Sequence, residues 1–134
     1  MFFFNTIKSN RISFSPSRVR ALTNDNHLTA IPAPGPGRAI QVVSASFRLD
    51  SGDVAYSFTN NLCLRAGRPA SPQFVLDVAI VNSSFDEWVG FVPVERGTLG
   101  ENQPLTFGPI AGANVSFKAD GDVYLDIAYR VVKY

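Results

Sequence analysis

The sequence has few of the side chains on which most enzyme chemistry depends. It contains one cysteine, Cys63, and one histidine, His27. A single cysteine excludes an intrachain disulfide and any zinc site built from several cysteines. These two residues are the only ones that could form a Cys–His catalytic pair, and their spacing gives no support for one. Because Cys63 lies between Leu62 and Leu64 in an apparent strand, the sequence predicts a buried or half-buried thiol.

Charge and long apolar runs are scarce as well. Lys and Arg total 12, Asp and Glu total 11, and charged residues make up only 17% of the 134 residues. The net charge of +1 excludes a strongly basic nucleic-acid-binding protein, so we expect no direct nucleic-acid partner. The opening run Met1–Phe4 is too short for a signal peptide or a spanning helix, and no later run is long enough. We therefore expect a soluble protein made in a cytoplasm, with no membrane partner.

Paired carboxylates suited to acid–base catalysis are also missing. A glycosidase needs two carboxylates at a fixed separation, whereas Asp86 and Glu87 are adjacent and Asp120 and Asp122 flank a turn glycine. Two aspartates of one turn lack the further oxygen ligands that calcium requires, so turn chemistry explains them better. The Pro/Gly stretch at 31–38 precedes a strand and contains no Gly-Lys-Ser/Thr, which predicts a structural corner and not a phosphate loop. These features predict no enzymatic activity, no metal site and no cofactor.

Apolar residues recur at every second position, which is typical of β-strands. The clearest case is 123–131, and because Asp120-Gly121 suits a tight turn we expect a hairpin over 114–132. A long strand over 38–49 changes the parity of its apolar residues at Val42-Val43. This change indicates either a β-bulge or a move between packing environments. Residues 38–66 as a whole read as a three-stranded meander.

The remaining segments predict short elements. Residues 74–81 fit either a buried strand or a short helix, and periodicity alone does not decide between them. The Ser-x-x-Glu spacing of Ser84–Glu87 predicts one helical turn before Trp88, and 95–104 is expected to be an exposed loop. Short strands are expected near 12–14, 19–22 and 28–31, and another from Leu105. The fold class is therefore all-β, a β-sandwich or jelly roll with about eight strands and at most one short helix.

The N-terminal residues differ in composition from the rest of the chain. The first twenty residues hold Lys8, Arg11, Arg18 and Arg20 and no acid, together with several phenylalanines. One interpretation is a floppy terminus. The other, supported by the aromatic residues that disordered tails usually lack, is an arm that packs on a neighbouring chain. We accordingly divide the chain into an arm, residues 1–15, and a β-sandwich domain, residues 16–134.

Several motifs resemble those of small structural proteins from the virions of tailed bacteriophages. They include RAL at 20–22, LTAIPAPGPGRAI at 28–40, LDSG at 49–52, LCLR at 62–65, ENQPL at 101–105, GDVYL at 121–125 and YRVV at 129–132. The resemblance spans about residues 18–132, departs from the pattern at Pro36, and does not cover the aromatic arm. It implies a virion β-sandwich, such as a capsid cement or decoration protein on the outer shell. No functional residue is defined by these motifs.

The expected function is therefore that of a cement protein made in the host bacterial cytoplasm and located on the capsid surface. Its partners would be the major capsid protein and copies of itself, as a trimer by analogy with the family. The candidate contact residues are Phe2, Phe3, Phe4, Arg11, Phe14, Arg18 and Arg20, with Trp88 as a weaker candidate because a buried core tryptophan is the interpretation that we favour. The alternative function is a tail, fibre or host-surface adhesion module that binds through loops such as 95–104.

Overall fold

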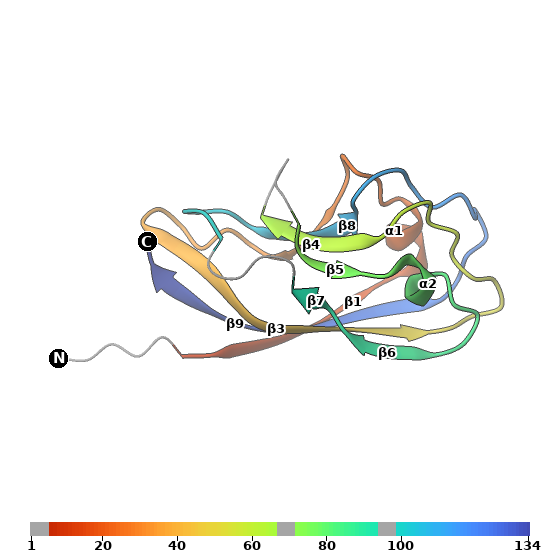
Figure 1. Ribbon diagram of the computed structural model, residues 1–134, viewed down its shortest axis with the longest axis horizontal. Helices are drawn as coiled ribbons and strands as arrows, with labels where there is room; N and C mark the ends of the chain where they lie inside the picture. The colour runs from red at the N-terminus through yellow and green to blue at the C-terminus, as the bar shows by residue number, and fades with distance from the viewer. Residues whose placement is uncertain (1–5, 67–71, 94–98) are drawn as a thin grey trace.

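The computed structural model describes residues 6–66, 72–93 and 99–134, which form two antiparallel β-sheets packed face to face (Figure 1). One sheet has the strand order β1-β9-β3-β6 and the other the order β2-β8-β4-β5-β7. In chain order the elements are β1 (Lys8–Phe14), α1 (Pro16–Arg20), β2 (Leu28–Ile31), β3 (Arg38–Asp50), β4 (Leu62–Ala66), β5 (Pro72–Leu76), α2 (Val78–Val81), β6 (Glu87–Gly90), β7 (Val92–Pro93), β8 (Leu105–Pro109) and β9 (Asp122–Lys133). The predicted all-β sandwich is confirmed.

The long strands β3 and β9 form the centre of the four-stranded sheet. On β9, Val123, Leu125 and Ile127 are buried while the residues between them are only half-buried, as the alternation over 123–131 predicted. This pattern places one face of the sheet on the core and leaves the other face open to solvent.

The predicted β-bulge is also confirmed. Val42 pairs with Tyr129 and Ser44 pairs with Ala128, so Val43 is the extra residue on β3. Because the bulge absorbs one residue, Ile40 and Phe47 both face the core although their positions differ in parity.

The core lies between the two sheets and is rich in aromatic rings. Phe107 on β8 stands with its ring centroid 6.4 Å from that of Phe47 on β3 and 6.2 Å from that of Phe91. β8 is buried along its whole length, and the strand expected from Leu105 is confirmed. Each large apolar side chain buried in this way contributes about 1.5–3 kcal/mol to the free energy of unfolding.

Two predicted strand pairings are wrong. The meander over 38–66 fails because β3 and β4 belong to different sheets, and the segment between them crosses the end of the sandwich. In that segment Tyr56 and Phe58 are buried, and Phe58 forms an isolated bridge with Asn114. The hairpin over 114–132 fails as well, since β9 pairs with β1 and β3 while Val115 and Phe117 are exposed.

The short helices also differ from expectation. Residues 16–20 form α1, where a strand was expected near 19–22, because Pro16 at the first helical position favours a helix. The ambiguous segment 74–81 contains both elements, since β5 ends at Leu76 and α2 begins after Asp77, whose side chain accepts a hydrogen bond from the Ala79 N–H. Two short helices therefore stand where at most one was expected.

The helical turn predicted before Trp88 is wrong. The Ser83 hydroxyl donates to the Glu87 carboxylate at 2.7 Å, and the Phe85 N–H donates to the Ser83 oxygen at 3.0 Å. These bonds shape a bend, and Glu87 is the first residue of β6. The Ser-x-x-Glu spacing of a capping box is thus present without the helix.

The Pro/Gly corner and the ENQPL motif are hydrogen-bonded to each other, although they lie more than sixty residues apart in the sequence. The Gly37 N–H donates to the Glu101 carboxylate at 2.7 Å, and the Gly35 N–H donates to the Asn102 side-chain oxygen at 2.9 Å. Both glycines have positive φ, which other residues rarely adopt. The predicted corner is confirmed, and its partner is the loop before β8.

At the other end of the sandwich, the segment that follows LDSG is hydrogen-bonded to the first residue of GDVYL and to the residue before it. The buried Tyr56 hydroxyl donates to the Gly121 carbonyl at 2.6 Å, and the Val54 N–H donates to the Asp120 carboxylate at 2.8 Å. This backbone bond lowers the pKa of Asp120. Gly52 packs so closely on Asp120 that a Cβ would lie 2.9 Å from its backbone carbon. Asp120 therefore joins the segment before β9 to the segment after β3, a long-range contact and not the local hairpin-turn role that was predicted.

Candidate interaction surface

The boundary expected at residue 15 does not coincide with the start of the sandwich. Residues 8–14 form β1, which pairs along its length with β9, from Lys8 opposite Tyr129 to Phe14 opposite Val123. The apolar side chains of this segment alternate inward, so the sheet extends through it. Phe2, Phe3 and Phe4 lie outside the described residues, and their contacts with a neighbouring chain stay a prediction.

Phe14 lies in the core and not at a surface. It is 2% exposed, and its ring stacks on Phe107 with the two centroids 5.9 Å apart and the planes 5° from parallel. A side chain in this position cannot reach a neighbouring chain while the sandwich is folded. The prediction that Phe14 is a partner anchor is therefore wrong, because its phase along β1 turns it toward the second sheet.

The three candidate arginines all make contacts within the chain. Arg11 on β1 forms a two-pronged ion pair with Asp126 on β9, with nitrogen–oxygen distances of 2.8 and 3.1 Å. This hydrogen-bonded pairing raises the pKa of Arg11. The Arg18 guanidinium lies 5.6 Å from the centroid of the Phe14 ring, and Arg20 donates to the Ala119 carbonyl at 2.7 Å. Arg11 and Arg18 remain exposed, so a partner can reach them while they keep these contacts within the chain.

Trp88 lies at the surface, and the favoured interpretation of a core tryptophan is wrong. Its side chain is 68% exposed on β6, an edge of the four-stranded sheet among the described residues. Phe85, three residues earlier in the bend, is 75% exposed. The sequence signal for the exposure of Phe85 lies two positions away on either side, because Ser83 and Glu87 are polar and no alternating apolar pattern includes Phe85.

Trp88 belongs to a row of side chains across the solvent-facing side of the sheet. It pairs with Arg48 on β3, which pairs with Tyr124 on β9. The Arg48 guanidinium lies 5.2 Å from the centroid of the Tyr124 ring and also holds Asp50 with two bonds of 3.0 and 3.1 Å. We call Trp88, Phe85, Arg48 and Tyr124 the aromatic surface.

A shallow hollow of about 360 Å³ lies beside Trp88. Asp86 lines it and accepts hydrogen bonds from the Ser51 N–H at 2.8 Å and the Ser51 hydroxyl at 3.0 Å, which lower its pKa. The Arg48–Asp50 pair lines it as well, so the groups here are already hydrogen-bonded within the chain. An exposed indole next to fixed polar groups is suited to binding a partner surface, because tryptophan is enriched among residues that dominate protein interfaces.

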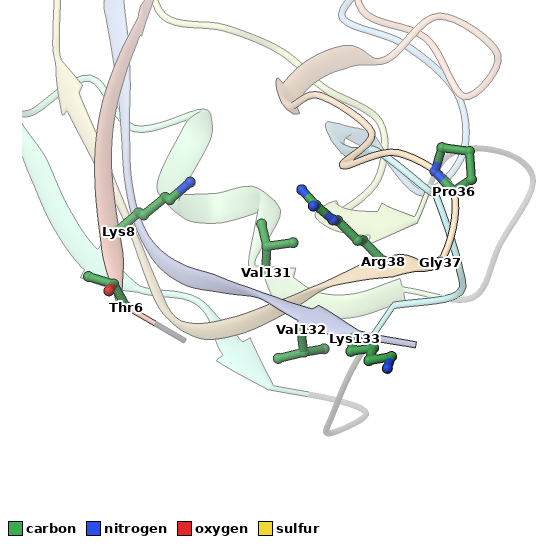
Figure 2. Close-up of a pocket in the computed structure, with 8 residues that line it drawn as sticks. All are labelled: Thr6, Lys8, Pro36, Gly37, Arg38, Val131, Val132 and Lys133. Carbon is green, nitrogen blue, oxygen red and sulfur yellow. The ribbon is translucent and has the colours of Figure 1, made fainter. Parts of the chain in front are cut away.

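A second hollow, of about 540 Å³, lies where β9 ends and β1 and β3 begin (Figure 2). Three cationic residues line it, and we call it the basic hollow. Figure 2 shows the side chains of Lys8 and Arg38 extending toward one another over Val131. The full lining consists of Thr6, Lys8, Pro36, Gly37, Arg38, Val131, Val132 and Lys133. Sequence reasoning missed this group, because Arg38 and Lys133 become neighbours only through the β3–β9 register.

The nucleophilic and metal-binding residue types of the described chain do not assemble into a reactive site. Cys63 is buried, as predicted, and burial raises the pKa of its thiol to about 11. Burial lowers the pKa of His27, whose ring nitrogens lie 3.3 Å from the Thr106 hydroxyl and 2.9 Å from the Pro109 carbonyl oxygen. Within the described ranges, no three or more His, Cys, Asp or Glu residues lie together as ligands for a metal ion.

The described helices are short, and none of them has the length and apolar character needed to cross a membrane.

No family model matches the sequence, and no curated protein matches it. The fold, however, is shared with a known structure. One chain of the solved capsid of Ralstonia phage GP4 superposes with a TM-score of 0.55 at 14% sequence identity, and the alignment covers 93% of this chain and 84% of that chain. At this identity the likeness shows a common fold, from which function does not follow directly.

Proposed function

We propose that this protein is a structural, non-enzymatic component of a bacteriophage virion that binds the outer capsid shell as a cement or decoration protein. Two findings support the proposal: the fold is shared with a chain of the Ralstonia phage GP4 capsid, and two of the motifs that resemble phage virion proteins are hydrogen-bonded to each other through Gly37 and Glu101. The observation that carries the choice of a binding role is the aromatic surface. Trp88 exposes its large apolar ring to solvent, and exposed apolar side chains that lie together on a surface mark interaction sites.

A cement protein acts through contact area. It binds across the joints between major capsid subunits, and its association free energy then stabilises the assembled shell over the separated subunits. In this proposal Trp88 is the central anchor and Phe85 extends the apolar contact, while Arg48 stays fixed by Asp50 and Tyr124 beside them. A side chain held in place before binding loses less conformational entropy when it binds.

The proposed N-terminal contact is confined to the residues before β1. Phe2, Phe3 and Phe4 remain the proposed apolar anchors of that segment, whereas Phe14 is withdrawn because it is buried. β1, the strand that follows this segment in sequence, lies at one edge of the sheet, and Trp88 lies on β6 at its other edge. Two contacts on one sheet would let one copy span a joint between capsid subunits.

Binding to bare capsids tests the proposal. We expect Trp88→Ala to weaken binding at least 30-fold, as replacing an interface hot spot of about 2 kcal/mol or more does. The matched control is Phe117→Ala, which removes an even more exposed aromatic ring, at 89%, from the loop before β9. Unchanged binding of the Trp88 variant, with unchanged thermal unfolding, would remove the aromatic surface from the proposal.

The number of copies in purified virions separates the cement function from the alternative. Hundreds of copies per particle are expected for a shell protein. A handful of copies, together with binding to host-surface glycans and none to bare capsids, would overturn the proposal in favour of a tail, fibre or adhesion module.

A further inference from the structure

The basic hollow is a site of unbalanced positive charge. Lys8, Arg38 and Lys133 line it, and none of the described residues that line it carries a carboxylate side chain. The two ion pairs found among the described residues lie elsewhere, between Arg11 and Asp126 and between Arg48 and Asp50. The acid that comes nearest through the Pro/Gly corner is Glu101, and its carboxylate accepts a hydrogen bond from the Gly37 N–H. The hollow therefore presents cations to a partner and not to its own chain.

The opposite end of the molecule carries the complementary charge. There Asp50 at the end of β3 pairs with Asp122 at the start of β9, so two carboxylates face each other across the sheet. Hydrogen bonds bring further acids to this end, Asp86 to Ser51 and Asp120 to Val54. We call the charged residues gathered here the acidic end, and their net side-chain charge is −3. The carboxylates are Asp50, Asp53, Asp86, Glu87, Asp120 and Asp122, and the cations are Arg20, Arg48 and Lys118.

The two ends lie too far apart to neutralise each other within one molecule. The thirteen residues of β3 run from Arg38 at the basic hollow to Asp50 at the acidic end. At about 3.3 Å per residue this strand is about 40 Å long, several times the Debye length of about 8 Å at physiological ionic strength. Figure 1 shows the same polarity, with the start of β1 and the end of β9 at one end of the long axis and the loops after β3 and before β6 at the other.

We propose that the basic hollow binds the acidic end of a second copy of this chain, in a head-to-tail contact. The loops of the acidic end form the tip of the molecule, and the basic hollow of about 540 Å³ receives part of that tip between Lys8 and Arg38. Such a contact joins two different surfaces, so it generates a ring when the rotation between copies closes, and the trimer implied by the family resemblance would be one such ring. The inference concerns the protein alone and does not rest on capsid binding.

Charge reversal of each end tests this contact in the full-length protein, with the mass measured by sedimentation equilibrium. The basic-hollow variant is Lys8→Glu/Arg38→Glu/Lys133→Glu. The acidic-end variant is Asp53→Lys/Asp122→Lys. All five side chains are exposed, and none forms a hydrogen bond with another described residue. We expect the wild-type protein to associate at 0.1 M salt and to associate at least tenfold more weakly at 1 M salt. At 0.1 M salt, each variant should associate with itself at least tenfold more weakly than the wild type.

Recombining the variants identifies the partner surface. When the two variants are mixed, or both ends are reversed in one chain, opposite charges face each other again and association is expected to return. Asp25→Lys, a reversal of an exposed charge that belongs to neither the basic hollow nor the acidic end, is the control and should leave association unchanged. The proposal is overturned if wild-type protein is monomeric at both salt concentrations, even if it binds capsids, or if the basic-hollow variant associates like wild type. Failure of the mixture to associate, with both variants folded by circular dichroism, also overturns it.

Discussion

Single side chains decide how the crossover between the two sheets is fixed. Tyr56 belongs to no strand, yet its hydroxyl donates to the Gly121 carbonyl at 2.6 Å and its ring lies 5.9 Å from that of Phe58, centroid to centroid. Burial raises the pKa of Tyr56 to about 12. This buried hydrogen bond, together with the bond from the Val54 N–H to Asp120, fixes the crossover to the segment before β9, and no local sequence pattern predicts either contact.

Tyr56→Phe is expected to lower the free energy of unfolding by about 1–2 kcal/mol at pH 7, because the Gly121 carbonyl loses its donor. The pH dependence follows from the raised pKa. The folded protein favours the neutral phenol, so this contribution is complete below pH about 10 and is lost as the pH rises to about 12.

Urea unfolding of both proteins at pH 7, 9 and 11 checks this prediction. The difference in stability between wild type and variant should shrink at pH 11. A difference that stays constant from pH 7 to 11 would contradict it, and Tyr134→Phe, which removes an exposed hydroxyl, serves as the control.

At the scale of elements, β3 shows what a bulge does for a long strand. Val42 and Ser44 pair with consecutive residues of β9, Tyr129 and Ala128, so Val43 has no partner in the register. Without Val43 the strand would alternate inward and outward without interruption. The bulge therefore accommodates one extra residue and keeps the apolar side chains on both sides of it on the core face.

Deleting Val43 should leave a cooperatively folded protein. The matched change is deletion of Ala128 from β9, which has no bulge on that strand and forces one half of β9 onto the wrong face of the sheet. We expect the first variant to retain a sigmoidal thermal transition and the second to lose it, as followed by near-ultraviolet circular dichroism. Equal loss in both variants would show that the bulge itself is essential.

The same elements show how far the sequence leads. Parity along the chain predicted the bulge, the inward face of β9 and the strands β2 and β8, because each depends on neighbours in sequence. Strand pairing could not be predicted in this way. Asp120-Gly121 has the composition of a hairpin turn, but Asp120 is held by Val54 and β9 pairs with β1 and β3. Non-local hydrogen bonds, absent from any local pattern, decide such pairings.

The candidate site was predicted less well for a related reason. Arg11 was selected for its charge, and that charge is used by Asp126, a residue 115 positions away. Trp88 was expected in the core because large aromatic side chains usually lie there, but its phase on the edge strand β6 turns it outward. Composition identified the residues with the capacity to bind, and the register between distant strands decided which of them face solvent.

At the scale of the whole molecule, β1 connects the N-terminal residues to the sandwich. It covers one edge of β9, and its last residue, Phe14, fills the core against Phe107. A test of the N-terminal segment must therefore stop before Lys8, since a longer deletion also removes a strand.

Removing residues 1–7 should change the free energy of unfolding by no more than about 0.5 kcal/mol, as for surface changes generally. Removing residues 1–14 should cost more than about 3 kcal/mol, the typical cost of losing one buried phenylalanine, and add an exposed edge on β9. Guanidinium unfolding measures both. Equal stability of the two truncated proteins would show that β1 contributes nothing to the fold.

The antiparallel pairing of β1 with β9 has a mechanical consequence. Lys8 stands opposite Tyr129, so β1 begins on the side of the sandwich where β9 ends (Figure 1). Tension applied through the two termini would open the ladder one hydrogen-bonded pair at a time, like a zipper, because the load falls on the outermost pair first. Force applied along β3 through its two ends would instead act on all the hydrogen bonds between β3 and β9 at the same time. The protein should resist stretching along its sheets far better than peeling at its termini.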